Sequence, residues 1–446
     1  MIRFLHAADL HIDSPLRGLG RYAGAPVERL RNATRRALVQ LVDLALREQV
    51  HFVLLAGDLY DRDWPDFHTG LFFREQMVRL VRAGIAVFIV QGNHDAQGVI
   101  SRQLPLPDAV RVFSSRTSET AHLPEIGVAI HGRSFPEREV PEDLVPHYPE
   151  PVAGAFNIGL LHTSLTGAAG HDTYAPTSLP VLRAKGYDYW ALGHVHARQV
   201  VSEAAPRVVF PGNLQGRHAN ETGPKGCELV SVQGGVIDAV FVPLDVVRWH
   251  QLSVPLDGID QLAAATQRVA QALAEATEAG GGASGAGGAG GAGGMGTAGG
   301  DRLHAMRIHL NGRTALHAEE ARQPGTLAAM VHAAAQDVAG VEVWIEQVRL
   351  AVSSPVDRAR IAEGQDAVAE LVRLVDELAA DPQRLADWSA RTLGEVLYKL
   401  PAEVLAGGLG QGAELPQLAD AQALRQLLMD AEATLLARLN AGGATA

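Results

Sequence analysis

The sequence is poor in cysteine and lysine and has no long apolar run. Its single cysteine, Cys227, excludes an internal disulfide and is typical of a reducing compartment. No stretch approaches the roughly 18 uninterrupted apolar residues that a membrane helix needs, and residues 1–5 run into a predicted strand without a basic leader and cleavage site. We therefore expect a cytoplasmic protein with no membrane partner.

The overall composition is that of a globular protein, but its charge is uneven. The 446 residues are enough for two or three domains, and 47% of them are apolar and 20% charged. The net charge of −12 argues against a nucleic-acid partner only at first sight. Residues 1–250 carry 24 basic and 26 acidic side chains, whereas residues 251–446 carry 14 and 24, so the acidity belongs mostly to the second half.

The first half has the pattern of an α/β fold. Strands and helices alternate, which predicts a parallel sheet with right-handed crossovers. Shorter apolar segments follow, so we expect a two-sheet sandwich flanked by helices. The alternating elements are expected at 2–8, 27–47, 52–56, 67–82 and 87–90, and the later strands at 128–130, 156–161, 189–192, 207–210 and 228–232.

The second half divides in two, which gives three predicted domains: 1–246, 247–354 and 355–446. The middle one reads as a small α/β domain interrupted by a Gly/Ala-rich insertion at 279–300. The last one is helical, and its helices either pack on their own core or form a surface for a partner. Elements are expected at 251–254, 259–278, 304–310, 327–338, 341–352, 365–380, 382–400 and 415–440.

Polar side chains follow the predicted strands where ligands gather in α/β sheets, at the carboxyl ends. After the strand that ends before Gly92 come Asn93, His94 and Asp95 in succession. Asn93 offers a neutral oxygen, and His94 can carry a proton beside it. Similar groups end four other segments, and together they predict a metal site: Asp9 and His11, Asp58, His162, and His194 and His196.

This order of motifs resembles that of the calcineurin-like metallophosphoesterases over residues 1 to about 245. Within that family the sequence most resembles the SbcD-like DNA-repair exonucleases, in particular their YhaO-type subgroup. The resemblance to this subgroup is carried by Phe210-Pro211-Gly212-Asn213-Leu214-Gln215-Gly216-Arg217-His218, followed by Glu221-Thr222-Gly223-Pro224-Lys225-Gly226. The resemblance implies a metallophosphoesterase sandwich, with residues 247–354 as the capping domain.

The resemblance also implies two divalent metal ions. Manganese is expected, and iron or Zn²⁺ also suits nitrogen and oxygen ligands without thiolate. Two such ions against two carboxylates leave a positive surplus that attracts phosphate. By the resemblance, one ion is bound by Asp9, His11, Asp58 and His196, and the other by Asp58, Asn93, His162 and His194.

Further roles follow from the same resemblance. His94 resembles the catalytic acid, with Asp61 as the carboxylate that raises its pKa, although the archaeal and eukaryotic repair nucleases carry a second histidine in place of Asp61. Arg62 either contacts phosphate or is a solvated loop arginine. Arg217 and His218 either contact DNA phosphates or belong to a structural turn.

The predicted function is hydrolysis of DNA phosphodiester bonds, as an exonuclease or endonuclease in DNA repair. The chain has no Walker-A pattern, so ATP chemistry would come from an SbcC-like ATPase with coiled coils. The resemblance also implies a homodimer. Two alternatives stay open: a phosphodiesterase or phosphatase for nucleotides and other small phosphoesters, and a non-catalytic subunit that binds DNA or an ATPase.

Overall fold

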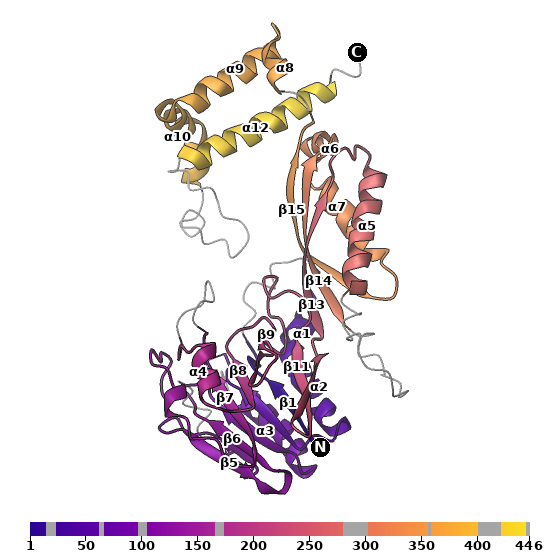
Figure 1. Ribbon diagram of the computed structural model, residues 1–446. Coiled ribbons are helices and arrows are strands. Elements are labelled where there is room, and N and C mark those ends of the chain that lie inside the picture. Colours follow the sequence, from indigo (N-terminus) through magenta and orange to yellow (C-terminus); the bar gives the residue numbers. More distant parts are fainter. Residues whose placement is uncertain are drawn as a thin grey trace. The chain divides into compact units, whose positions relative to one another are not determined.

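The computed structural model describes residues 1–14, 24–61, 67–96, 105–165, 174–279, 302–355, 358–399 and 421–442 (Figure 1). By its internal contacts the chain divides into two compact units. The first comprises Met1–Gln251, Thr277–Met306 and Gly340–Trp344, and the second comprises Leu252–Ala276, Arg307–Ala339 and Ile345–Ala446. The three predicted domains stay a prediction, and the predicted insertion at 279–300 lies outside the described residues except for its first one.

The first sheet confirms the predicted parallel core. Strands β1 to β4 run parallel to their neighbours, and β11 and β12 extend the sheet antiparallel on the other side of β1. Every residue of β2 is buried, as expected for a strand covered on both faces. In sheet order the strands are β12 (Val236–Pro243), β11 (Gly226–Gln233), β1 (Ile2–Ala7), β2 (Phe52–Ala56), β3 (Ala86–Val90) and β4 (Val110–Val112).

Helices α1 (Val27–Arg31), α2 (Ala33–Arg47) and α3 (His68–Arg82) belong to the same unit. Apolar side chains of α2 and α3, among them Leu38 and Met77, share one buried core with side chains of this sheet. The single helix predicted over 27–47 is wrong in one respect, because Asn32 divides it. At this residue the side-chain Nδ2 and the backbone N–H both donate to the Glu28 carbonyl, at 2.9 and 3.1 Å.

A second sheet packs on the other face of the first and completes the predicted sandwich. Phe4 and Leu54 from the first sheet and Ile130 and Leu160 from the second meet in one buried core. Strands β6, β7, β8 and β10 are parallel, with antiparallel strands at both edges. In sheet order they are β5 (Glu119–Leu123), β6 (Val128–Gly132), β7 (Phe156–His162), β8 (Tyr189–Gly193), β10 (Arg207–Phe210) and β9 (Gln199–Ser202), with α4 (Leu179–Ala184) and the short helices η3 (Pro124–Ile126) and η4 (Val145–His147) between them in sequence.

The remaining elements are a three-stranded sheet and helices, as predicted in kind. Helices α9, α10 and α12 pack on a core of their own, which includes Val375, Leu385 and Leu428. No helix among the described residues is long and apolar enough to cross a membrane. The strands are β13 (Val247–Pro255), β14 (Leu303–Arg313) and β15 (Glu342–Ser353), and the helices are α5 (Leu262–Ala279), α6 (Leu316–Arg322), α7 (Thr326–Gln336), α8 (Arg358–Ala362), α9 (Ala367–Ala380), α10 (Pro382–Tyr398) and α12 (Ala421–Gly442).

Candidate metal centre

The predicted site residues come together where strands of both sheets end. The carboxyl ends of parallel strands share one edge of a sheet, so the side chains that follow them converge. At this edge the two sheets touch closely, since a Cβ added to Gly193 would lie 1.9 Å from the Ala56 carbonyl oxygen. Asp9 follows β1, Asp58 follows β2, Asn93 follows β3, His162 is the last residue of β7, and His194 follows β8.

The turns that carry these residues have a strained backbone. The backbone φ angles of Asp9, His11, Asp58 and His194 are positive, at 51°, 43°, 51° and 108°. Residues other than glycine seldom adopt this conformation. Backbone hydrogen bonds hold the first two turns together, from Asp9 N to the Gly57 oxygen and from His11 N to the Asp58 oxygen, both 3.0 Å. Strain of this kind is typical of functional sites.

Asp95 fixes the turn after β3 against the loop after β2. Its carboxylate accepts hydrogen bonds from the backbone N–H groups of Leu59, Tyr60 and Gly92, each 3.1 Å long. Gly92 must be glycine for this approach, because a Cβ there would lie 2.3 Å from Asp58 Oδ1. The glycine in the motif thus lets two loops with polar side chains come into contact.

His11 and His196 face each other with their Nε2 atoms 3.1 Å apart. Behind them, His11 Nδ1 lies 3.2 Å from Asp61 Oδ1, and His196 Nδ1 lies 2.7 Å from Glu221 Oε1. A carboxylate only accepts hydrogen bonds, so the His196 ring carries its proton on Nδ1, whereas the contact of His11 Nδ1 with Asp61 lacks the geometry of a hydrogen bond. Burial lowers the pKa of His11 to about 4. The neutral His196 ring therefore points its Nε2 lone pair at the His11 ring.

Carboxylates of two buried aspartates border this histidine pair. Asp9 Oδ1 lies 3.9 Å from His196 Nε2, and Asp58 Oδ2 lies 3.9 Å from His11 Nε2. Burial raises the pKa of Asp9 to about 7, and the neighbouring Asp58 also raises it, while His196 lowers it. The two carboxylates and the two rings thus converge on one place, where a bound cation would be stabilised.

A second group of acceptors surrounds His162. Its Nδ1 donates to the Ala56 carbonyl at 2.9 Å, which leaves Nε2 without a proton. This Nε2 lies 3.0 Å from Asn93 Oδ1 and 3.6 Å from Asp58 Oδ2. Burial lowers the pKa of His162 to about 3, so the ring is neutral at pH 7. Asp58 thus borders both groups.

His194 completes the predicted set in a different way. Its backbone N–H donates to both oxygens of Asp9, at 3.0 and 3.2 Å. Its ring lies edge-on to those of His162 and Tyr174, with centroid distances of 5.3 and 5.4 Å. The residue therefore orients the Asp9 carboxylate, and its ring lies beside the second group.

This arrangement fits divalent cations with nitrogen and oxygen ligands. Potential ligand atoms of Asp9, His11 and His196 lie within 4.8 Å of one another, as do those of Asp9, Asp58 and His162. Imidazole and carboxylate donors without thiolate suit manganese, iron or zinc. The lone pair of His196 Nε2 faces His11, and the lone pair of His162 Nε2 faces the Asn93 amide, so the chemistry of this donor set matches metal binding.

His94 and Asp61 form a pair at the more open side of the site. His94 Nδ1 lies 3.1 Å from Asp61 Oδ1, and its side chain is 27% exposed. The hydrogen bond to Asp61 raises the pKa of His94, although burial opposes the shift. Asp61 Oδ2 accepts from Ser14 Oγ at 2.6 Å. Burial opposes ionisation of Asp61, but its bonds to His11 and His94 nevertheless hold its pKa below the usual value.

The three predicted substrate-binding residues differ in their exposure and in their contacts. Arg62 lies outside the described residues. The His218 side chain is 51% exposed, and its Nε2 lies 3.8 Å from Glu221 Oε1. Arg217 is only 15% exposed, and its guanidinium lies between Glu221, at 3.0 Å, and Asp61, at 3.5 Å. Two of the three predictions therefore fall within or beside one cluster of charged groups.

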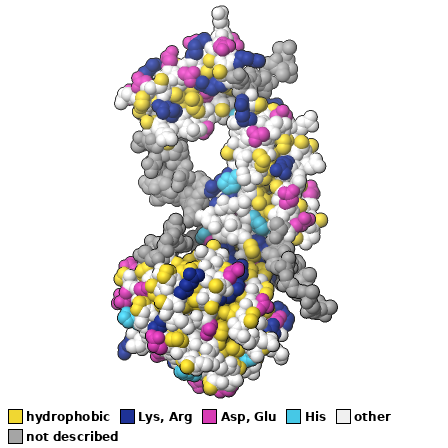
Figure 2. All heavy atoms as spheres, viewed as in Figure 1, with side chains coloured by type: hydrophobic (Ala, Val, Ile, Leu, Met, Phe, Trp, Pro, Cys, Tyr) yellow, Lys and Arg dark blue, Asp and Glu magenta, His cyan; other side chains and the backbone are white. Residues whose placement is uncertain are grey.

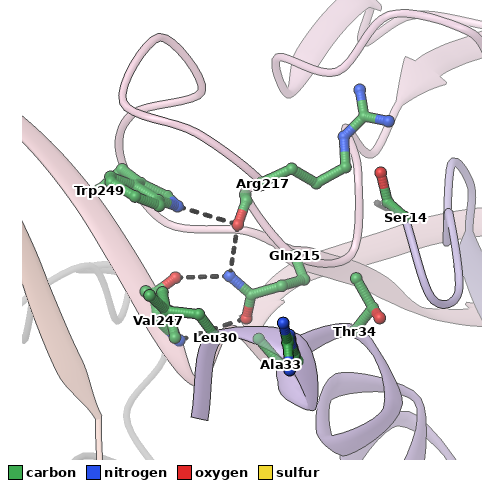
Figure 3. A pocket seen from close by; sticks show the side chains of 10 residues that line it. Ser14, Leu30, Ala33, Thr34, Gln215, Arg217, Val247 and Trp249 are labelled. Atoms are coloured by element: carbon green, nitrogen blue, oxygen red, sulfur yellow. Dashed lines mark hydrogen bonds between the residues drawn. The ribbon is translucent and has the colours of Figure 1, made fainter. Parts of the chain in front are cut away.

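A small pocket adjoins this cluster (Figure 3). Gln215 fixes its wall, because its Nε2 donates to the carbonyls of Gly216 and Val247 at 2.8 and 2.6 Å. The Trp249 indole N–H donates to the same Gly216 carbonyl at 3.0 Å. Figure 3 shows the Arg217 side chain extending away from Trp249, on the side where Ser14 lies. The backbone just before Arg217 is thus held in place.

Glu221 and Ser14 are site residues that the sequence analysis did not identify. Glu221 is 8% exposed and belongs to the segment that carries the YhaO-type resemblance, so its position was a signal. Ser14 is a common residue in a loop, and nothing in the sequence singles it out. Their roles depend on partners distant in sequence, 47 residues away for Ser14 and 25 for Glu221 with His196.

Comparisons with known proteins agree with this fold. Residues 2–198 match the model of the calcineurin-like phosphoesterases, and residues 293–353 match that of the middle domain of metallophosphoesterase YhaO. Residues 2–198, fewer than half of the chain, are therefore similar to the calcineurin-like metallophosphoesterases, a family that uses divalent metals. The predicted family resemblance is confirmed, whereas the SbcD-like subgroup stays a prediction.

Individual relatives are similar over part of the chain. The chain is 38% identical over 271 residues to "Uncharacterized metallophosphoesterase YhaO" of Bacillus subtilis (strain 168), over 60% of this chain and 66%, just under two thirds, of the relative. Two solved structures match with TM-scores of 0.34 only. They are GAP50, the anchor in the inner membrane complex of Plasmodium (12% identity, 55% of this chain and 84% of that chain), and a dimetal phosphatase from Danio rerio (14%, 52% and 93%).

Proposed function

We propose that the chain hydrolyses phosphodiester bonds with two divalent cations, and that its substrate is DNA. The observation that carries the reaction type is the pair of opposed contacts, Nε2 to Nε2 between His11 and His196 at 3.1 Å and Nε2 to Oδ1 between His162 and Asn93 at 3.0 Å. A cation bound among these groups would be stabilised by them.

The proposed ligand sets are those of the sequence analysis. Asp9, His11, Asp58 and His196 hold one ion, and Asp58, Asn93, His162 and His194 hold the other. We propose manganese, and the same donors suit iron or zinc. When bound, two such ions supply Lewis acidity that activates water and stabilises charge on the phosphoryl oxygens.

His94 is the proposed general acid. Its Nδ1 faces Asp61 at 3.1 Å, while its Nε2 lies 4.0 Å from Asp58 Oδ2 and so points toward the cation site. Its raised pKa favours the protonated ring near neutral pH. A protonated imidazole at this position can give its Nε2 proton to the oxygen that leaves phosphorus. Asp61 orients the ring and stabilises its charge.

The choice of DNA rests on the resemblance of residues 1 to about 245 to the SbcD-like exonucleases. An SbcC-like ATPase and a second copy of the chain are proposed partners on the same ground. On the face seen in Figure 2, acidic and basic side chains of the described residues are interspersed rather than gathered by sign. The described residues on this one face form no broad basic track for a duplex, and small phosphoesters are therefore kept as the second candidate substrate.

Purified full-length protein in Mn²⁺ tests this proposal on duplex DNA with defined ends, on cyclic nucleotides and on a chromogenic diester. We expect cleavage that a chelator abolishes. His94→Ala should lower kcat by about 10²–10⁴-fold without loss of bound Mn²⁺. His122→Ala is the matched control, because this histidine is exposed on β5.

The outcomes separate the parts of the proposal. Turnover of small diesters without DNA cleavage would move the substrate to the second candidate. Full activity of His94→Ala would remove that residue from the mechanism. Protein that binds no divalent cation would contradict the reaction type itself.

A further inference from the structure

The two opposed histidines are each supported from behind by a carboxylate. His11 has Asp61 at 3.2 Å from its Nδ1, and His196 has Glu221 at 2.7 Å. Arg217 lies between the two carboxylates, with Nη2 3.0 Å from Glu221 Oε1 and Nη1 3.5 Å from Asp61 Oδ2. The order of charges along this chain of contacts is negative, positive, negative.

Glu221 can fill its place only as a carboxylate. Its Oε1 receives His196 Nδ1 at 2.7 Å and Arg217 Nη2 at 3.0 Å. Its Oε2 receives Asn213 Nδ2 at 2.9 Å and the Arg217 backbone N–H at 2.7 Å. A glutamine would turn its NH₂ group toward donors on one side or the other. Only two accepting oxygens satisfy all four groups.

These contacts determine which nitrogen of His196 carries the proton. Arg217 Nη2 also lies 3.3 Å from His196 Nδ1, but the 2.7 Å contact of that nitrogen with Glu221 requires a proton between them. The proton is therefore on Nδ1, and Nε2 is free to bind a cation. With a glutamine whose NH₂ faced the ring, Nδ1 would have to accept, and the proton would move to Nε2.

Arg217 is held too firmly to act as a mobile phosphate ligand. Its backbone N–H and guanidinium both bond Glu221, and Asp61 lies on its other side. Its side chain is 15% exposed. Release toward a substrate would leave two carboxylates, largely buried, without their counter-charge, which is costly.

We propose that Glu221, Arg217 and Asp61 form a clamp that keeps the Nε2 atom of His196 unprotonated and aimed at a cation shared with His11. Glu221 and Arg217 are positioning residues in this proposal, and Arg217 is not a phosphate ligand. The proposal rests on the proposed function, since it requires that the two histidines bind a metal.

Titration of chelator-treated full-length protein with Mn²⁺ by calorimetry tests the clamp. Glu221→Gln, which keeps the size of the side chain, should weaken one of two Mn²⁺ sites by about 10–100-fold, the usual effect of losing such a support. Glu346→Gln is the matched control. Glu346 also receives an arginine, with Arg307 Nε and Nη2 both at 2.8 Å, but belongs to the second unit. Its Mn²⁺ affinities should equal those of the wild type.

Two further measurements exclude a merely structural role. Histidine-selective ¹⁵N NMR of the metal-free protein should show one ring changing from the Nδ1–H to the Nε2–H form in Glu221→Gln. For Arg217→Ala, kcat for a chromogenic diester at limiting Mn²⁺ should fall at least tenfold with KM nearly unchanged. Circular dichroism checks that both variants fold. If Glu221→Gln does not fold, the kinetics of Arg217→Ala test the clamp instead.

Each result has one meaning. Wild-type Mn²⁺ affinities in folded Glu221→Gln would overturn the clamp alone, and so would an Arg217→Ala variant with raised KM and unchanged Mn²⁺ binding. Wild-type protein that binds no Mn²⁺ would overturn the proposed function, and the clamp with it.

Discussion

Buried acids are compensated differently in the two units. In the second unit, Glu346 has Arg307 at 2.8 Å, and Glu432 has Arg358 at 2.8 Å, with both carboxylates at most 5% exposed. In the first unit, Asp9 and Asp58 are at most 3% exposed, and their ion-pair partners among the described residues are histidines at 3.6–4.0 Å. The second unit balances its buried charge within the chain, whereas the site does not.

The lack of arginine partners is confined to the acidic residues of the site and does not extend to every buried acid of the first unit. Asp245, fully buried in that unit, has Arg248 at 2.7 Å and Arg302 at 3.4 Å. A buried acid with an arginine partner is part of the fold's own charge balance. Asp9 and Asp58 have only imidazole rings as ion-pair partners among the described residues, so a bound cation would supply charge that the chain does not, since unpaired charge in the interior is costly. Charge balance thus marks the site independently of any motif.

The largest expected effect is that of Asp58→Asn, which removes the carboxylate shared by both groups. In Mn²⁺ the activity should fall by about 10³-fold or more, because neither ion keeps its full ligand set. Metal-free protein should melt no lower than the wild type at pH 7, because repulsion between Asp58 and Asp9 is relieved. The diester assay measures the activity, and calorimetric melting with and without chelator measures the melting temperature. A lower melting temperature in the metal-free variant would contradict the idea that this charge is uncompensated.

Asp61→Asn should have a smaller effect that depends on pH. The hydrogen bond to Asp61 raises the pKa of His94, so the protonated ring persists to higher pH and an acid role is lost as pH rises through that pKa. Without the carboxylate the pKa falls, and the alkaline limb of the kcat profile should move to lower pH. At saturating Mn²⁺ and neutral pH we expect a loss of about 10–10²-fold. An unmoved alkaline limb would show that another group supplies the proton.

Glu346→Gln should lower the stability of the protein and leave its kcat unchanged. The loss of charge opposite Arg307, which is 12% exposed, should lower the free energy of unfolding by about 1–3 kcal/mol. Urea denaturation of the full chain measures this change, and the diester assay should give wild-type kcat. Reduced kcat in a folded variant would show that the second unit's charges also serve the reaction.

The fold could be predicted where the strands are apolar throughout. Phe52–Ala56 and Ala86–Val90 lie in the middle of the first sheet, and continuous apolar runs are typical of such strands. The edge strands Glu119–Leu123 and Gln199–Ser202 were missed because half-exposed edges tolerate polar residues and leave little periodicity. The pairing of β11 with β1 was missed too, because the two strands are more than two hundred residues apart.

The sequence by itself determined the kinds of donor and where they occur: carboxylate, amide and imidazole groups directly after strands whose ends share one edge. Only the tertiary structure decided which nitrogen faces which. His11 and His196 lie 185 residues apart in the chain, yet their Nε2 atoms are 3.1 Å apart, and Glu221 fixes the proton of one ring. The physical reason is that a strand end depends on local patterns, whereas a histidine's protonation depends on partners that folding brings from elsewhere.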